Sequence, residues 1–276
     1  MSFSINSNIS AMRANLNSNI KNQGLDNTLG MLSSGSKLGN AAYDASGLGI
    51  ANQLSAQVSG LGQAIMNSND TIGMIQVADG AMSGINDNME RIRVLTLQAS
   101  NGILGENDRE IIQKEIDSLL ESSDDIAKTT SYNGINLLDG SGGTTGDGTF
   151  STQSGADSGD TQDVHIADAQ VASLLGSIDI RTEAGRTSAL ESVDSALSSI
   201  GDSRAELGAS QNQLMSNIRN ISVTQVNVAS AESQIRDVDF AQESANFSRA
   251  NIMSQVGAFS QAQANASASN VTRLFQ

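Results

Sequence analysis

The sequence predicts a mainly α-helical protein, built as a long antiparallel helical bundle or coiled-coil rod with a small β-hairpin region in the middle of the chain. Three observations lead to this fold class. The 276 residues contain no proline, which favours uninterrupted helices because proline removes a backbone donor and clashes with the preceding turn. Only 3% of the residues are aromatic, so the core must consist mainly of aliphatic side chains. The third observation is a long stripe of apolar residues with the spacing of a coiled coil.

This stripe occupies thirteen positions between Val193 and Ile235, separated by alternating steps of four and three residues. A helix over these residues would be roughly 65 Å long at 1.5 Å per residue. A compact globule of this chain length would be only ~45–50 Å across, so the helix predicts a rod. We expect the stripe to pack within the subunit against residues 44–131, and its polar members to set the register. Its nine apolar positions are Val193, Leu197, Ile200, Leu207, Leu214, Ile218, Ile221, Val228 and Ile235, and its polar positions are Arg204, Gln211, Gln225 and Glu232.

The N-terminal half predicts three helices. An apolar stripe in the first 32 residues stops at a segment rich in glycine and serine, residues 32–43. A second long helix is expected to begin near Asp44 or Ser46, and residues 101–107 are expected to form the turn that follows it. Residues 108 to about 130 form the third predicted helix.

The middle of the chain loses this helical periodicity. Glycine, serine, threonine and aspartate dominate residues 140–163, and apolar and polar residues alternate around Val164. This pattern predicts one or two β-hairpins. Helix is expected to resume around Thr187 and to continue through the stripe, and a last helix is expected after Asp237–Asp239.

Charge is distributed unevenly along the chain. The net charge is −15, but residues 1–43 and residues 244–276 each carry +2, which leaves −19 on the residues between them. One interpretation is that the two ends are frayed tails. The other is that both ends become buried together in an assembly.

The composition argues against several partners. An acidic chain is not expected to bind nucleic acid. The N-terminus lacks a basic stretch followed by an apolar run, so it is not a secretory signal peptide. No stretch approaches the ~20 apolar residues that a membrane span needs, and we therefore expect no membrane insertion.

The search for chemistry predicts no enzyme. The chain has no cysteine and a single histidine, His165, which excludes a His/Cys zinc cluster and an HExxH site. Glycine-rich residues 141–148 lack the Lys-Ser/Thr that holds nucleotide phosphates. The aspartates of the middle region lack the spacing of a calcium loop. We expect no catalytic residue, no cofactor and no metal.

Seven segments have the form of motifs of one known family: residues 5–17, 32–51, 90–102, 131–140, 204–214 and 231–255, and the C-terminal VTRLFQ. They resemble bacterial flagellins, the subunits of the flagellar filament. Together the similar regions cover about residues 1–140 and 187–276, in the order in which the family has them. The variable outer domain of many flagellins is almost missing, so the chain resembles a near-minimal version.

The resemblance implies a division of the chain. Residues 1–43 and 238–276 would form the N- and C-terminal parts of an inner terminal-helix domain. Residues 44–131 and 187–237 would form the two halves of a helical rod, and residues 132–186 would replace the variable domain. In flagellins the terminal helices pair and line the inner tube of the filament. The residues expected to carry assembly are Ile5, Ile9, Met12, Leu16, Ile20, Ile252, Val256, Phe259, Val271 and Leu274.

The resemblance also implies function and partners. The chain is expected to be a structural subunit that self-assembles into the helical filament used for swimming, after type III export to the cell exterior. Its partners would be further copies of itself, a filament cap, a hook-associated junction protein and a flagellin export chaperone. The alternative is a hook–filament junction protein of the same superfamily.

One segment resembles the surface through which many flagellins are recognised by a Toll-like receptor of a host. Arg91, Leu95 and Gln98 match this motif, Glu115 aligns with a further contact, and Val94 stands where the family commonly has an acidic residue. The alternative, which the sequence favours, is that Arg91 and the nearby Arg93 pair with an acidic neighbouring subunit.

Overall fold

The structure of the protein, a computed structural model, describes residues 8–42, 44–143 and 145–274. Ile5 and the side chains of Val271 and Leu274 lie outside the described residues. The elements are α1 (Ile9–Ser34), α2 (Ala45–Ala99), α3 (Glu106–Thr129), β1 (Ser131–Tyr132), β2 (Ile135–Asn136), β3 (Thr149–Gln153), β4 (Thr161–His165), α4 (Val171–Leu174), α5 (Glu183–Arg236) and α6 (Phe240–Leu274). The predicted fold class, long helices with a small β-hairpin region in the middle of the chain, is confirmed.

Four of the helices begin at a polar side chain that accepts a backbone N–H of the first turn, which is the usual way to satisfy these otherwise unpaired donors. Asn8 accepts from Ala11 at 3.0 Å before α1. Asp44 caps α2 by accepting from the Gly47 N–H, and Thr182 caps α5 by accepting from the Gly185 N–H. Asp239 caps α6 by accepting from the Ala241 and Gln242 N–H groups. The Thr182 cap explains why α5 begins at Glu183, four residues before the predicted start at Thr187.

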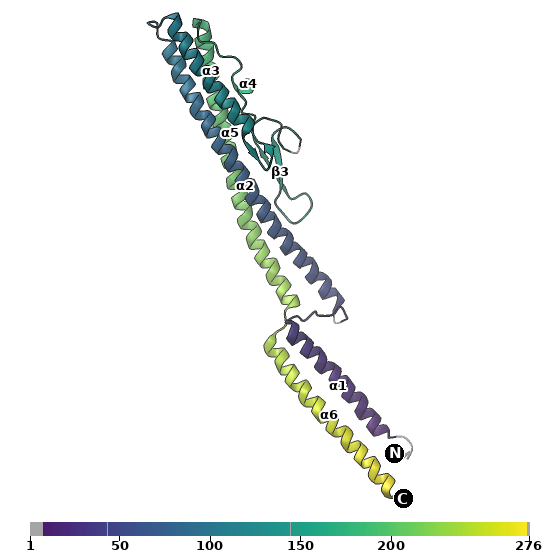
Figure 1. Cartoon of the computed structure of the whole chain (residues 1–276). Coiled ribbons are helices and arrows are strands. Elements are labelled where there is room, and N and C mark those ends of the chain that lie inside the picture. Colours follow the sequence, from purple (N-terminus) through teal and green to yellow (C-terminus); the bar gives the residue numbers. More distant parts are fainter. Residues whose placement is uncertain (1–7, 43, 144, 275–276) are drawn as a thin grey trace. The chain divides into compact units, whose positions relative to one another are not determined.

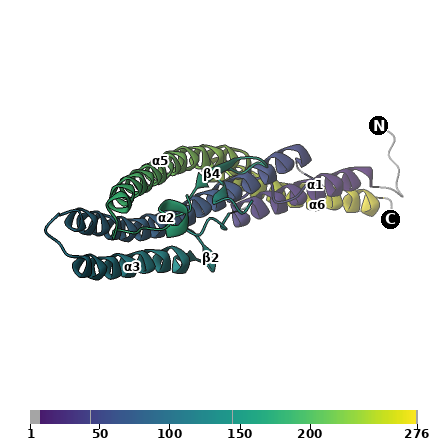
Figure 2. The same cartoon turned by 90° about the horizontal axis from the view of Figure 1, so that it is seen from above.

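The chain divides into two compact units, one made of residues 1–56 and 227–276 and the other of residues 57–226. In the second unit α2 lies between α3 and α5 (Figure 2). Ion pairs join Asp79 to Arg204 and Arg93 to Asp194, so α2 and α5 run antiparallel. The buried side chains that face one another here include Met82, Ile85, Met89, Ile92 and Leu95 of α2, Ile112 and Ile116 of α3, and Val193, Ile200, Leu207 and Leu214 of α5.

Two antiparallel hairpins follow α3. In the first, Tyr132 pairs with Ile135 across a two-residue turn whose Asn133 and Gly134 have φ values of 51° and 79°, as a type I′ turn requires. In the second, β3 pairs with β4 over five residues, with Phe150 opposite Val164. Gln162 and Val164 alternate with exposed residues along β4, so one face of this hairpin is buried.

In the first unit α1 and α6 lie side by side along their length (Figure 1). Asn8 Nδ2 donates to the Ala264 carbonyl at 3.3 Å, and Ser254 Oγ donates to Asn22 Oδ1 at 2.7 Å, so these two helices also run antiparallel. α1 ends at Ser34 because Gly35 adopts the left-handed conformation, with φ 66°. The break predicted after residue 32 is confirmed there.

The segments that follow α1 and precede α6 are joined by their backbones. Ser36 and Asp237 form an isolated antiparallel bridge. The Lys37 N–H donates to the Arg236 carbonyl at 2.7 Å, and the Val238 N–H donates to the Gly35 carbonyl at 3.1 Å. α1 therefore ends, and α6 begins, next to the same group of backbone hydrogen bonds.

Candidate assembly surfaces

The terminal helices pack side by side but leave large apolar residues exposed to water. No described residue of α1 or α6 is buried. A protein surface always carries single apolar residues, but a row of them on one pair of helices marks a surface that a partner covers. Most of the predicted assembly residues belong to this row: Ile9 is 54% exposed, Met12 69%, Leu16 61%, Ile20 55%, Ile252 61%, Val256 52% and Phe259 72%.

A groove of about 840 Å³ runs along the ends of the two terminal helices. Ile9, Met12 and Leu16 line one side, and Gln261 and Asn265 of α6 line the other. Among the described residues that line it, Arg13 alone is charged. The groove is therefore apolar and amide-rich, which suits a helix of similar composition better than a charged ligand.

The α5 stripe faces inward through its whole length. Among its apolar members, Val193, Ile200, Leu207 and Leu214 are buried. Leu197, Ile218, Ile221, Val228 and Ile235 are half-buried. The stripe is thus most deeply covered in its first half, where α3 and the hairpins add to the core of the second unit.

Two of the four polar members of the stripe, Arg204 and Gln225, bond to residues of α2. Arg204 Nε donates to Asp79 Oδ1 at 2.7 Å, and this hydrogen bond raises the pKa of Arg204 above its ordinary value. Gln225 Nε2 donates to the Val58 carbonyl at 3.1 Å. These two contacts fix the lengthwise position of α5 on α2, because a slip of one turn would leave partly buried polar groups without partners.

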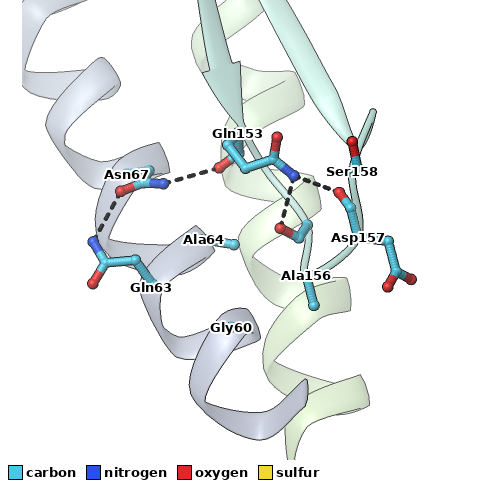
Figure 3. A pocket seen from close by; sticks show the side chains of 9 residues that line it. Gly60, Gln63, Ala64, Asn67, Gln153, Ala156, Asp157 and Ser158 are labelled. Carbon is cyan, nitrogen blue, oxygen red and sulfur yellow. Dashed lines mark hydrogen bonds between the residues drawn. The ribbon is translucent and has the colours of Figure 1, made fainter. Parts of the chain in front are cut away.

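The β3–β4 hairpin is seated on α2 by a polar network. Thr71 and Thr152 share a buried hydroxyl contact of 2.8 Å. Figure 3 shows Asn67 of α2 donating to the Gln153 carbonyl, at 3.2 Å, above a hollow of about 340 Å³. Below it Gly60 approaches the hairpin turn so closely that a Cβ there would lie 3.2 Å from Ala156 Cβ. A glycine at this position of α2 therefore allows the close approach without displacing Ala156.

Of the four residues predicted to contact a receptor, three are exposed and one is buried. Arg91 and Glu115 join α2 to α3 through a 2.6 Å ion pair and are about half exposed, and Gln98 is exposed beside them. Leu95 is 1% exposed and belongs to the core, so its side chain is not available to a receptor and must be removed from the set. Its position in the run Met82, Ile85, Met89, Ile92 and Leu95, with helical spacing, is the signal for its burial.

Both arginines of this region have a partner within the chain, whereas the sequence favoured a partner on a neighbouring subunit. Arg91 pairs with Glu115. Arg93 pairs with Asp194 at 2.6 Å, and the hydrogen bond to that carboxylate raises the pKa of Arg93. These exposed pairs contribute little to stability, but they tie α3 and α5 to the same stretch of α2.

No arrangement for catalysis or metal binding stands out in the part of the chain that the structure describes. No group of three or more His, Cys, Asp or Glu side chains is placed to hold a metal there. His165 is exposed at the end of β4, with Nδ1 at 3.4 Å from Thr149 Oγ1. Over the same residues, no helix is long and apolar enough to cross a membrane.

Comparison with known sequences identifies the family. Residues 5–142 match the bacterial flagellin N-terminal helical region, and residues 190–275 match the bacterial flagellin C-terminal helical region. The chain belongs to the bacterial flagellin family. A flagellin of Halalkalibacterium halodurans is 36% identical over 276 residues, which cover 99% of both chains. The 31.3 kDa flagellar filament core protein of Treponema maltophilum is 35% identical over 285 residues, again covering 99% of both.

Solved structures agree with this flagellin assignment. The crystal structure of Bacillus cereus flagellin matches with a TM-score of 0.50 and 29% identity, covering 60% of this chain and 94% of that one. A putative flagellar hook-associated protein from Vibrio parahaemolyticus matches with a TM-score of 0.58, over 71% of this chain and all of that one. At 15% identity the second likeness concerns the fold alone.

The chain is a structural subunit of the bacterial flagellar filament. Its flagellin relatives match it over their full length, and nothing in the comparisons favours the hook–filament junction alternative. Flagellins form a structural protein family whose filament lies outside the cell, and motility and export follow from membership of it.

Proposed function

We propose that α1 and α6 carry the main contacts by which copies of this flagellin assemble, and that residues 57–226 provide the folded body of the subunit. The observation that carries this proposal is the contrast in burial between the two stripes. The α5 stripe is covered within the chain, whereas the apolar residues of the terminal helices are largely exposed.

Charge supports the same assignment. Residues 244–276 contain two arginines and no acidic residue, so copies of this segment meet without bringing acidic side chains out of water. Burying one exposed valine, leucine, isoleucine, methionine or phenylalanine side chain stabilises a contact by about 1.5–3 kcal/mol. The seven exposed apolar residues of α1 and α6 given above are therefore enough for a stable polymer, after the costs of association and ordering are subtracted.

The remaining functional assignments follow the family. We propose export of the unfolded chain by the flagellar type III apparatus and assembly outside the cell into a filament for swimming. A filament cap, a hook-associated junction protein and an export chaperone act as its partners. The subunit catalyses no reaction, and His165 has no chemical role.

We also propose that the surface formed by Arg91, Gln98 and Glu115 is accessible to a Toll-like receptor of a host on the unassembled subunit. Its support is the half-exposed ion pair between Arg91 and Glu115. Glu115→Gln would then lower receptor activation by monomers while leaving filament growth unchanged. Unaltered activation would remove this surface from consideration.

Growth on filament seeds tests the main proposal. Leu16→Ala and Phe259→Ala should each raise the concentration at which growth begins by about tenfold, which corresponds to a loss of about 1.4 kcal/mol of contact energy. Ser18→Ala, a small change on the same helix, is the matched control and should grow normally. If both apolar variants elongate seeds at the wild-type critical concentration, the terminal helices are not the assembly surface.

A further inference from the structure

The chain contains two Asn-Gly sequences, Asn101-Gly102 and Asn133-Gly134, and the structure places them in different settings. In such a sequence the backbone nitrogen of the glycine can attack the side-chain carbonyl carbon of the asparagine, because no Cβ on the glycine obstructs the approach. All four residues are exposed. Exposure alone therefore does not distinguish the two sites.

Asn133-Gly134 is held by its turn. Both residues have positive φ, at 51° and 79°, and the flanking Tyr132 and Ile135 are paired in the hairpin. The attack closes a five-membered ring that fixes the torsion about the Cα–C bond of the asparagine. In a type I′ turn that torsion is already set by the hairpin, so the reaction requires the turn to open first.

Asn101-Gly102 has the opposite properties. It lies between α2 and α3. The Asn101 N–H donates to the Gln98 carbonyl at 3.1 Å, but the bonds to the Asn101 carbonyl are long: the Leu104 nitrogen lies 3.3 Å and Arg109 Nη2 3.4 Å from that oxygen. Within the described residues, the Gly102 amide has no hydrogen-bond acceptor. The nitrogen that must attack is thus free to move and is not engaged elsewhere.

The side chain of Asn101 is also activated. Its Oδ1 accepts a hydrogen bond from the Ile103 N–H at 3.3 Å. When a nucleophile adds to Cγ, negative charge develops on Oδ1, and a backbone donor already aimed at this oxygen stabilises that charge.

We propose that Asn101 is a site of spontaneous deamidation in this subunit and that the structure protects Asn133. The Gly102 nitrogen forms a bond to Asn101 Cγ, the Cγ–Nδ2 bond breaks, and ammonia leaves with the proton of the Gly102 amide, which gives a succinimide. Water then opens the ring at either carbonyl, leaving a carboxylate on an aspartate or an isoaspartate. No oxidant, reductant or enzyme is required.

The product alters the turn between α2 and α3. An aspartate places a negative charge next to Arg109, whose guanidinium already donates to the Ala99 carbonyl at 3.1 Å and lies near the carbonyl of residue 101. An isoaspartate instead lengthens the main chain by one methylene at the point where the two helices are joined. Each subunit thereby gains one negative charge at this end of α2.

The test is a time course on the folded, unpolymerised full-length protein at mildly alkaline pH and 37 °C, followed by peptide mass spectrometry and an isoaspartate assay. Residue 101 should convert first, and residue 133 should convert at least about tenfold more slowly, equivalent to about 1.4 kcal/mol for opening its turn. In urea both turns are lost and the two rates should converge. Equal rates in the folded protein, or the same ratio in urea, would overturn the proposal.

Gly102→Ala provides the matched variant. A Cβ at residue 102 would meet no heavy atom within 4 Å, and this glycine does not have positive φ, so the fold tolerates the substitution. Conversion at residue 101 should fall by about tenfold or more because the added methyl group obstructs the attacking nitrogen. Unchanged conversion would show that the Gly102 nitrogen is not the nucleophile.

Discussion

Leu207→Ala tests whether the α5 stripe stabilises the subunit. Leu207 is 1% exposed in the middle of the stripe, and the substitution removes three carbon atoms from the core between α2 and α5. At about 0.8 kcal/mol for each buried carbon, the transfer term alone is ~2.4 kcal/mol. A residual cavity adds to this, since the two helices are held apart by their other side chains, so we expect a loss of about 3–4 kcal/mol.

Urea unfolding followed by far-UV circular dichroism measures this loss, because the chain contains no tryptophan for a fluorescence assay. Leu16→Ala is the comparison: it removes the same three carbons from a side chain that is 61% exposed, and should change the free energy of unfolding of the unassembled subunit by less than about 0.5 kcal/mol. A cost below about 1 kcal/mol for Leu207→Ala, or similar costs for both variants, would refute the argument from burial.

Three further predictions concern the subunit itself. Gly80→Ala should raise the free energy of unfolding by about 0.5–1 kcal/mol, because a Cβ at this helical position meets no heavy atom within 4 Å. Gly60→Ala crowds the hairpin, so it should raise the free energy of unfolding by less, or lower it. Equal increases for the two variants in urea unfolding would contradict the close approach at Gly60. Asp79→Asn should cost about 0.5–1 kcal/mol, since its ion pair with Arg204 is over a third exposed, and a double-mutant cycle with Arg204→Met measures the pair itself. Hydrogen bonds from Ser141 and, to a smaller extent, from Asn136 lower the pKa of Asp139. The ionised carboxylate therefore stabilises the fold at neutral pH, and this stabilisation is lost as the pH falls below about 4. In the Asp139→Asn variant, the free energy of unfolding should depend less on pH in this acidic range.

The helix boundaries followed from local chemistry that a sequence displays directly. The break at Gly35 and the turn predicted at residues 101–107 are marked by residues that favour turns. The break lies where the structure has it, whereas α3 begins at Glu106, two residues before the predicted start. The start of α5 was placed four residues late because its apolar periodicity begins after its cap. Thr182 is a good cap by composition, but Thr187 follows five residues later, and only the bond from Gly185 singles out Thr182.

The partners of polar side chains could not be read from the sequence. The pairs Arg204–Asp79 and Asn217–Gln162 join residues 125 and 55 positions apart, and they depend on the relative rotation and register of separate elements. The sequence did not predict α4, because its four residues are too few to show helical periodicity.

Leu95 shows how two sources of inference can disagree. Its helical spacing from Met89 and Ile92 predicts burial, whereas the family resemblance places it in a receptor surface. The structure buries it at 1% exposure. At this position the periodicity of the chain itself was the better guide.

The scarcity of buried side chains in α1 and α6 has a kinetic consequence. Because no described residue of either helix is fully buried, contacts within one subunit offset only part of the entropy lost on ordering the pair. In the proposed assembly through α1 and α6, neighbouring copies supply the rest, so folding of these helices is coupled to binding. The first few subunits must therefore order their ends with incomplete contacts, which makes nucleation slow, while a subunit that arrives at an existing end meets a finished template. The number of filaments is then set by the number of starting points, and the supply of subunits sets only their length.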